Sequence, residues 1–131
     1  MLKSLLNTLA LILVFSASVY AQTVVTVSEN ITEDVTWTSD NEYLLDGGIF
    51  VTNDATLTIE PGTVVRGGTG ENLDASFLVI TRGAKINAQG TATSPIIFTA
   101  ELDDLDDATD LTKDDTGLWG GVVLLGKATT N

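Results

Sequence analysis

The sequence contains no cysteine and no histidine, and these two absences remove much of the common catalytic and metal-binding chemistry. Without cysteine there is no disulfide, no thiolate nucleophile, no thiolate zinc site and no lipid-modified cysteine of a bacterial lipoprotein. Without histidine, Ser-His-Asp catalysis and imidazole metal ligation are excluded within this chain. A small domain without disulfides must be held together by its own core or by a neighbouring domain.

Basic residues are also scarce. Six lysines and arginines stand against 18 aspartates and glutamates, which gives a net charge of −12. Such a surface repels phosphate backbones and anionic lipid head groups, so we expect no nucleic-acid partner. The same charge favours solubility and attracts divalent cations.

Residues 1–21 have the pattern of a secretory signal peptide. Lys3 supplies a positive charge, an apolar run follows over residues 5–15, and Val19-Tyr20-Ala21 suits a signal peptidase. We expect cleavage after Ala21 and a secreted or cell-surface protein. The apolar run is shorter than the roughly 20 residues of a spanning helix, so we expect no stable membrane anchor after cleavage. Loss of Lys3 leaves 18 acidic against 5 basic residues, a net charge of −13.

The rest of the chain alternates short apolar strands with turns, and one phrase recurs. Residues 51–63 read VTNDATLTIEPGT and residues 80–91 read ITRGAKINAQGT, a period of about 29 residues that is typical of a solenoid. The alignment places Leu57 and Ile86 on one inward ladder. It places three side chains outward: Thr56, Thr58 and Lys85. A third copy begins at Gly121 and aligns Leu124 with Ile80 and Ala128 with Ala84.

The repeat predicts an all-β fold, a parallel β-helix in which equivalent residues stack into ladders. An antiparallel β-sandwich, which also uses short strands bounded by turns, is the alternative. We expect residues 22–48 to be an N-terminal capping segment and residues 49–131 to be rungs. Because the third copy stops in mid-phrase, we expect the rungs to continue past Asn131, as downstream partners on the same polypeptide.

The block ATLTIEPGTVV at residues 55–65 resembles the opening rungs of large secreted right-handed β-helix proteins of Gram-negative bacteria. Residues 83–99 and 119–126 resemble their second and third rungs. This resemblance implies a right-handed coil at the N-terminal part of such a protein. Some of these proteins end in a sorting domain of the type IX secretion system, so the resemblance implies cargo of that kind. It implies no particular activity.

Residues 101–116, ELDDLDDATDLTKDDT, form an acidic insertion between the second and third rungs, with eight carboxylates and one lysine. Calcium takes about six to eight oxygen ligands, so carboxylates on a loop suit it. The candidate ligands are Asp104, Asp106, Asp107 and Asp110. Their spacing is not that of an EF-hand, because Ala108 and Thr109 fill positions that need a ligand and a glycine. A solvated insertion without metal is the alternative that we favour, since charge blocks usually stay in solvent.

Residues 67–73, GGTGENL, faintly resemble the calcium-binding nonapeptide, but that motif works as a tandem array. A single imperfect copy is more typical of a flexible loop.

The rival to a binding or structural role is a carbohydrate-active enzyme. β-Helix polysaccharide lyases combine calcium-binding carboxylates with an arginine or lysine base, and the residues to compare are Arg66, Arg82 and Lys85. No cluster of aspartates accompanies them at a matching phase, and no two carboxylates are paired as a glycosidase requires. Trp37 and Trp119 are suited to stacking on sugars, but we expect them to pack in the core or over an end of the coil.

We therefore expect a secreted or cell-surface scaffold with a structural or adhesive role. We favour a non-enzymatic protein and expect no catalytic residue and no cofactor in this chain. The partner to consider is a polysaccharide or another cell-surface component. One alternative is the N-terminal part of a lyase-like enzyme whose active site lies downstream. The other alternative is a calcium-binding surface module.

Overall fold

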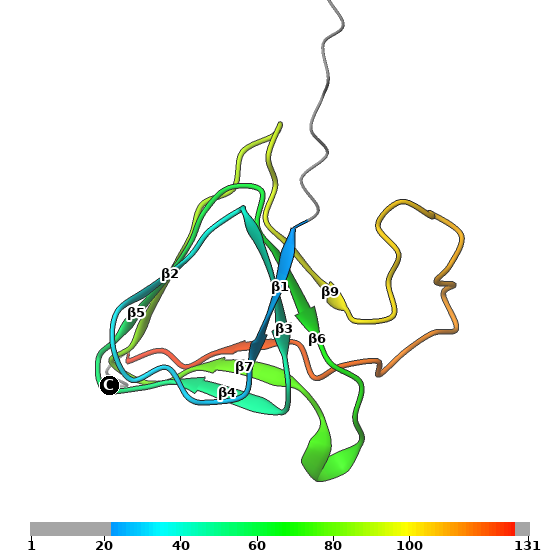
Figure 1. Ribbon diagram of the computed structural model, residues 1–131. Helices are drawn as coiled ribbons and strands as arrows, with labels where there is room; N and C mark the ends of the chain where they lie inside the picture. The colour runs from blue at the N-terminus through cyan, green and yellow to red at the C-terminus, as the bar shows by residue number, and fades with distance from the viewer. Residues whose placement is uncertain (1–21, 128–131) are drawn as a thin grey trace, which may run out of the picture.

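The computed structural model describes residues 22–127, which form a coil of strands with a triangular cross-section (Figure 1). The expected signal peptide and its cleavage site after Ala21 lie outside the described residues. The elements are β1 (Thr23–Val27), β2 (Val35–Trp37), β3 (Asn41–Leu45), β4 (Gly48–Val51), β5 (Thr56–Ile59), β6 (Val64–Gly67), the 3-10 helix η1 (Asn72–Asp74), β7 (Phe77–Ile80), β8 (Lys85–Ala88), β9 (Ile97–Ala100) and β10 (Val122–Leu124). Within residues 22–127, no helix has the length and apolar character needed to cross a bilayer.

The strands form three sheets, and every strand pair is parallel. Sheet A has the order β1-β3-β6-β9, sheet B the order β4-β7-β10, and sheet C the order β2-β5-β8. Consecutive strands belong to different sheets, so the chain circles an axis instead of folding back on itself. The coil is a right-handed parallel β-helix, the hand that parallel crossovers adopt. The antiparallel sandwich is excluded, because the strand pairs are all parallel.

The strand registers confirm the repeat. Leu57 pairs with Ile86 across sheet C, and Leu124 pairs with Ile80 across sheet B. Ala128 lies outside the described residues. Leu57 is fully buried, whereas the neighbouring side chains predicted to face outward are half-buried (Thr56 and Thr58) or exposed (Lys85). The alternation of buried and accessible positions along β5 is the period of two expected for a strand with one face in the core.

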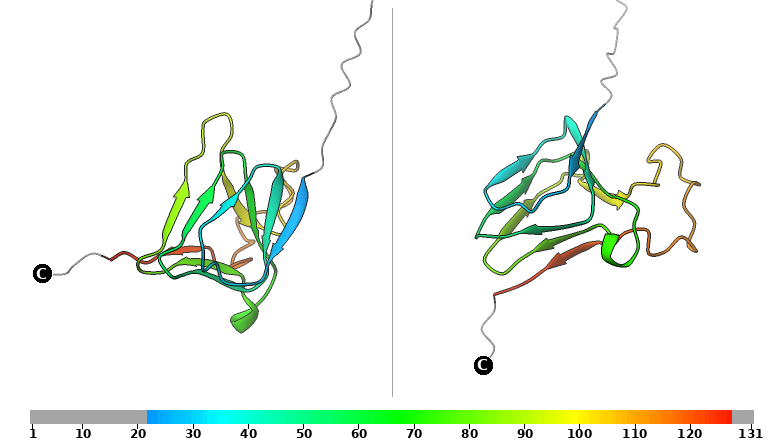
Figure 2. Two further views of the ribbon diagram at one scale, coloured as in Figure 1. Left: turned by 60° about the vertical axis from the view of Figure 1, so that its left-hand side comes forward. Right: turned by 60° about the horizontal axis from the view of Figure 1, so that its bottom comes forward.

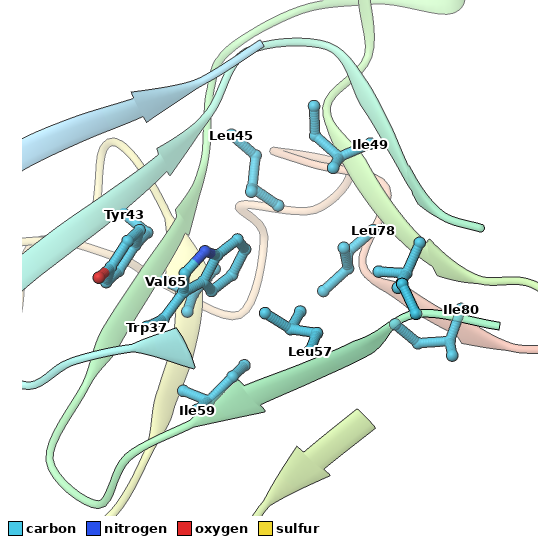
Figure 3. Close-up of a cluster of buried hydrophobic side chains, with 11 residues drawn as sticks. Trp37, Tyr43, Leu45, Ile49, Leu57, Ile59, Val65, Leu78 and Ile80 are labelled. Atoms are coloured by element: carbon cyan, nitrogen blue, oxygen red, sulfur yellow. The ribbon is translucent and has the colours of Figure 1, made fainter. Parts of the chain in front are cut away.

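The core fills the interior of the triangle with side chains from all three sheets. In Figure 3, Leu57 of sheet C and Leu78 of sheet B point toward each other inside the coil. Trp37 is only 3% exposed and stacks on Tyr43, with ring centroids 4.7 Å apart and an interplanar angle of 14°. The buried cluster consists of Trp37, Tyr43, Leu45, Ile49, Val51, Ala55, Leu57, Ile59, Val65, Leu78 and Ile80. Burial of each large side chain contributes roughly 1.5–3 kcal/mol, so these ladders stabilise the coil without disulfides.

Two aromatic side chains lie where the neighbouring rung has a glycine. Phe77 pairs directly with Gly48, and its ring occupies the space that a Cβ at Gly48 would need. Trp119 lies in the same way against Gly67 and packs on the buried cluster. Each glycine is therefore required by close approach of a ring and not by an unusual backbone angle.

Part of the N-terminal segment, which we predict to be a cap, pairs with the rungs. β3 lies within the segment 22–48, yet it pairs with β1 on one side and with β6 on the other. Tyr43 and Leu45 of β3 are buried and continue the inward ladder of sheet A. Residues 41–48 therefore belong to the rungs. The first turn consists of β1, a single parallel bridge from Ile31 to Val51, and β2.

Candidate functional site

The two long loops of the coil leave it at the same corner. Residues 68–76, which include η1, connect β6 of sheet A to β7 of sheet B. One turn later, residues 101–121 connect β9 of sheet A to β10 of sheet B, and both loops project outside the triangle (Figures 1 and 2). Glu101 joins them, because its Oε2 accepts hydrogen bonds from the backbone N–H of Thr69 at 3.1 Å and from its hydroxyl at 3.4 Å.

Arg66 fixes the start of the acidic insertion to the outer face of sheet A. Its Nε donates to Oε1 of Glu42 at 2.5 Å, and the two side chains are 13% and 20% exposed. Its Nη1 donates to the carbonyl oxygens of Ala100, at 3.3 Å, and of Asp103. The guanidinium presents several N–H donors in a rigid plane, so it can hold the carboxylate and the loop carbonyls at the same time. Arg66 is a positioning residue for the insertion.

A cavity of about 400 Å³ opens beside Arg66 on the same face. Its lining combines aliphatic side chains with four carboxylates and one guanidinium: Val24, Leu44, Leu102, Glu42, Glu101, Asp103, Asp104 and Arg66. The single positive charge is paired with Glu42, so the remaining carboxylates give the cavity a negative potential. The arrangement suits a ligand with an apolar stem and a positive end.

The four predicted calcium ligands are all exposed in the insertion, and the carboxylates of Asp104, Asp107 and Asp110 accept local hydrogen bonds. The carboxylate of Asp110 accepts a hydrogen bond from the N–H of Asp104, and that of Asp104 accepts from the N–H of Asp106 at 3.0 Å. Asp107 accepts from the N–H and the hydroxyl of Thr109 at 2.9 and 2.7 Å. Within the part of the chain that the structure describes, no three acidic side chains are arranged to hold a metal ion.

Two carboxylates of the insertion have lowered pKa values. The hydroxyl of Thr109 lowers the pKa of Asp107 below its ordinary value of 3.8, and the N–H of Thr109 adds to the effect. Thr112 lowers the pKa of Asp115 in the same way, with its hydroxyl at 2.7 Å and its N–H at 2.8 Å. Both carboxylates therefore act as ionised acceptors that stabilise turns.

The structure separates the basic residues that the lyase comparison singled out. Arg66 lies on sheet A, whereas Arg82 follows β7 and Lys85 begins β8, at the corner between sheets B and C. Both of these are exposed. Trp37 is buried in the core as predicted, and Trp119 is half-buried against it.

The glycine-rich segment after β6 forms a compact corner loop. Gly68 is buried, and the short helix η1 begins at Asn72, which has a positive φ of 56°. Leu73, inside η1, is 98% exposed.

Sequence reasoning missed the pairing of Glu42 with Arg66. The two residues are 24 positions apart, close to one turn of the coil, and Arg66 pairs in the ladder with Leu44, two residues after Glu42. Opposite charges offset by two positions in successive rungs are the signal that identifies such a pair.

Comparison with known proteins gives one match. A family model described as a pectate-lyase-like beta helix domain matches residues 29–131. No curated protein and no solved structure matches the chain. The matched segment covers all strands of the coil except β1. Its description agrees with the coil of three parallel sheets. The chain therefore belongs to the family of pectate-lyase-like β-helix domains.

Proposed function

We propose that this protein is a secreted or cell-surface scaffold with a structural or adhesive role. In this proposal the β-helix is a rigid rod that presents two loops at one corner. The observation that carries the proposal is the attachment of both loops at their bases: Arg66 bonds to the carbonyls of Ala100 and Asp103, and Glu101 bonds to Thr69. A loop fixed at its base keeps its position while its tip stays accessible.

The exposed apolar side chains support this role. Leu73 in the first loop is 98% exposed, and Leu102 and Leu105 in the acidic insertion are 59% and 43% exposed. Large apolar side chains exposed on projecting loops are candidates for contact with a partner. The partner in this proposal is a polysaccharide or another cell-surface component.

Export is part of the proposal and is supported by the signal-peptide pattern of residues 1–21, with cleavage after Ala21. The resemblance to large β-helix proteins of Gram-negative bacteria supports such an origin and secretion through the type IX system.

The test is expression of the full chain in a Gram-negative host with a type IX system, followed by fractionation and mass spectrometry of the N-terminus. We expect protein at the cell surface or in the medium that begins at Gln22.

Binding to intact cells and to a polysaccharide array should fall when Leu73 and Leu105 are both replaced by serine. A matched control, Thr36→Ser on the outer face of β2, should bind as the wild type does. Cytoplasmic protein with an intact Met1, or unchanged binding by the leucine variant, would contradict the proposal.

A carbohydrate-active enzyme remains the second candidate, supported by the description of the matched family. Incubation with polygalacturonate and calcium distinguishes the two, because eliminative cleavage produces unsaturated sugars that absorb ultraviolet light. We expect no cleavage. Cleavage by the wild-type protein would replace the scaffold with an enzyme.

A further inference from the structure

β1 is the outer strand of sheet A. It pairs with β3 on one side, and among residues 22–127 no strand pairs with its other side (Figure 2). Edge strands are usually protected by charge, proline or a bulge, because unpaired N–H and C=O groups invite another strand. Residues 22–28, QTVVTVS, contain no charge and no proline. Val24 and Val25 are 55% and 36% exposed.

The direction of the backbone groups of β1 follows from one hydrogen bond. The carbonyl oxygen of Val27 accepts from the N–H of Asp46 at 2.9 Å, so Val27 directs its backbone polar groups toward β3. Successive residues of a strand direct these groups to opposite sides. Val24 and Thr26 therefore direct their N–H and C=O groups to the free edge, where an added strand would bond to them.

A strand added at this edge would lie beside the cavity described above. Val24 pairs with Glu42 and belongs to the cavity lining, so its side chain is on the outer face of sheet A. Neighbouring strands are about 4.8 Å apart, so an outward side chain of the added strand would lie next to Val24. A long side chain at that position would extend into the cavity.

The charge of the cavity selects the side chain. The aliphatic stem of lysine or arginine would lie along Val24, Leu44 and Leu102, and long basic side chains bury their stems in this way. The positive group would be attracted by the carboxylates that line the far side of the cavity: Glu101, Asp103 and Asp104.

A second copy of this chain fits the edge less well. Each copy carries a net charge of −12, so two copies repel each other. The pairing of two five-residue strands would also bury far less than the roughly 1,000 Å² of a stable interface.

We propose that the free edge of β1 binds an extended peptide with basic side chains at alternate positions, by strand addition to sheet A. The peptide takes main-chain hydrogen bonds from Val24 and Thr26, and its outward lysine or arginine enters the acidic cavity. This site goes beyond the scaffold proposal and does not rest on Leu73 or Leu105, the two leucines replaced in the test of that proposal.

The test uses protein purified after expression of the full chain and a fluorescent, end-blocked heptapeptide of alternating lysine and valine. Fluorescence anisotropy should show saturable binding that weakens as the salt concentration is raised.

Thr26→Pro removes the backbone N–H of residue 26, which is a donor on the free edge, but leaves the bonds of Val25 and Val27 to β3. Val25 is extended and therefore tolerates a following proline. Binding should weaken by about tenfold or more in Thr26→Pro, the factor expected for a lost hydrogen bond, and Thr26→Ala should bind like the wild type.

Two control peptides keep the test decisive if Thr26→Pro fails to fold. A heptapeptide of alternating glutamate and valine should not bind. The lysine–valine peptide with alternate N-methylated residues, which cannot complete a strand ladder, should bind at least about tenfold more weakly. Equal binding of either control overturns the proposal. Concentration-dependent dimerisation of the protein alone, abolished by Thr26→Pro, also overturns it, because the occupant would then be a second copy.

Discussion

The coil and its acidic insertion are built from opposite kinds of interaction. In the rungs, side chains such as Leu45, Ile49 and Leu57 have no exposed area, and stability comes from apolar ladders that link successive turns. In residues 101–116 nearly all side chains are exposed. The hydrogen bonds there are mostly local, and in them backbone N–H groups donate to aspartate carboxylates one to six residues away.

This difference shows how one short chain combines a rigid coil with a loop whose sequence does not depend on the packing of that coil. The ladders depend on shape and apolar area, so they tolerate little change in volume. The insertion depends on hydrogen bonds to its own turns, so its sequence can vary without disturbing the stack. The base of the insertion is coupled to the coil through Arg66 and to the neighbouring loop through Glu101.

The largest expected effect is in the ladder of sheet C. Leu57→Ala should lower the free energy of unfolding by roughly 2–5 kcal/mol, because it leaves a cavity in a fully buried position. Thr58→Ala, the adjacent outward position, should change it by less than about 0.5 kcal/mol. Chemical denaturation measures both, and equal effects would contradict the assigned faces.

The link between the two regions should have a smaller effect. Arg66→Ala should destabilise the protein by about 1–3 kcal/mol, because it leaves Glu42 and the carbonyl of Asp103 without their donor. Hydrogen exchange should rise in residues 101–116. Lys113→Ala is the matched control, since its pair with Asp114 is 87% and 80% exposed and should contribute under about 0.5 kcal/mol. If residues 101–116 keep their protection from hydrogen exchange in Arg66→Ala, the hydrogen bonds of Arg66 are not what holds the insertion in place.

The next effect is confined to the insertion and depends on pH. Because Thr109 lowers the pKa of Asp107 below 3.8, the ionised carboxylate stabilises its turn above that pH. The stabilisation is lost as the pH falls through the lowered pKa. NMR titration should therefore show Asp107 titrating below 3.8, and Thr109→Val should raise the pKa toward 3.8. Thr116→Val, as a control, should leave the titration of Asp107 unchanged.

Calcium should have the smallest effect. The carboxylates of Asp104, Asp107 and Asp110 are already acceptors for backbone groups of their own loop. We expect millimolar calcium to leave the melting temperature nearly unchanged in the wild type. The variant with asparagine at Asp104, Asp106 and Asp107 should behave alike. Micromolar affinity in calorimetry, absent from this variant, would instead support the calcium-binding module.

The coil could be predicted from the sequence because its signal is periodic. Equivalent residues such as Leu57 and Ile86 recur at one rung spacing, and stacking then fixes their faces. The contacts at the loop corner could not be predicted in the same way. Arg66 reaches Asp103 only because β6 and β9 are neighbours and the insertion turns back over sheet A. Such contacts depend on the path of an aperiodic loop, for which the sequence carries no repeating signal.

The N-terminal segment shows the same contrast between a periodic and an aperiodic signal. The first turn has only a single bridge, at Ile31, where later turns have a strand, and its sequence lacks the recurring phrase. Tyr43 and Leu45 nevertheless continue the ladder.

The fit of Phe77 over Gly48 and of Trp119 against Gly67 has a consequence for how the coil assembles. Parallel strands of similar apolar sequence can slide by two residues and still bury their inward faces. A slide here would bring each ring against a residue that has a Cβ and would leave each glycine facing an unfilled gap. The two rings therefore favour one register at the two places where they lie. A slide of either contact would be opposed by a steric clash and by an unfilled gap.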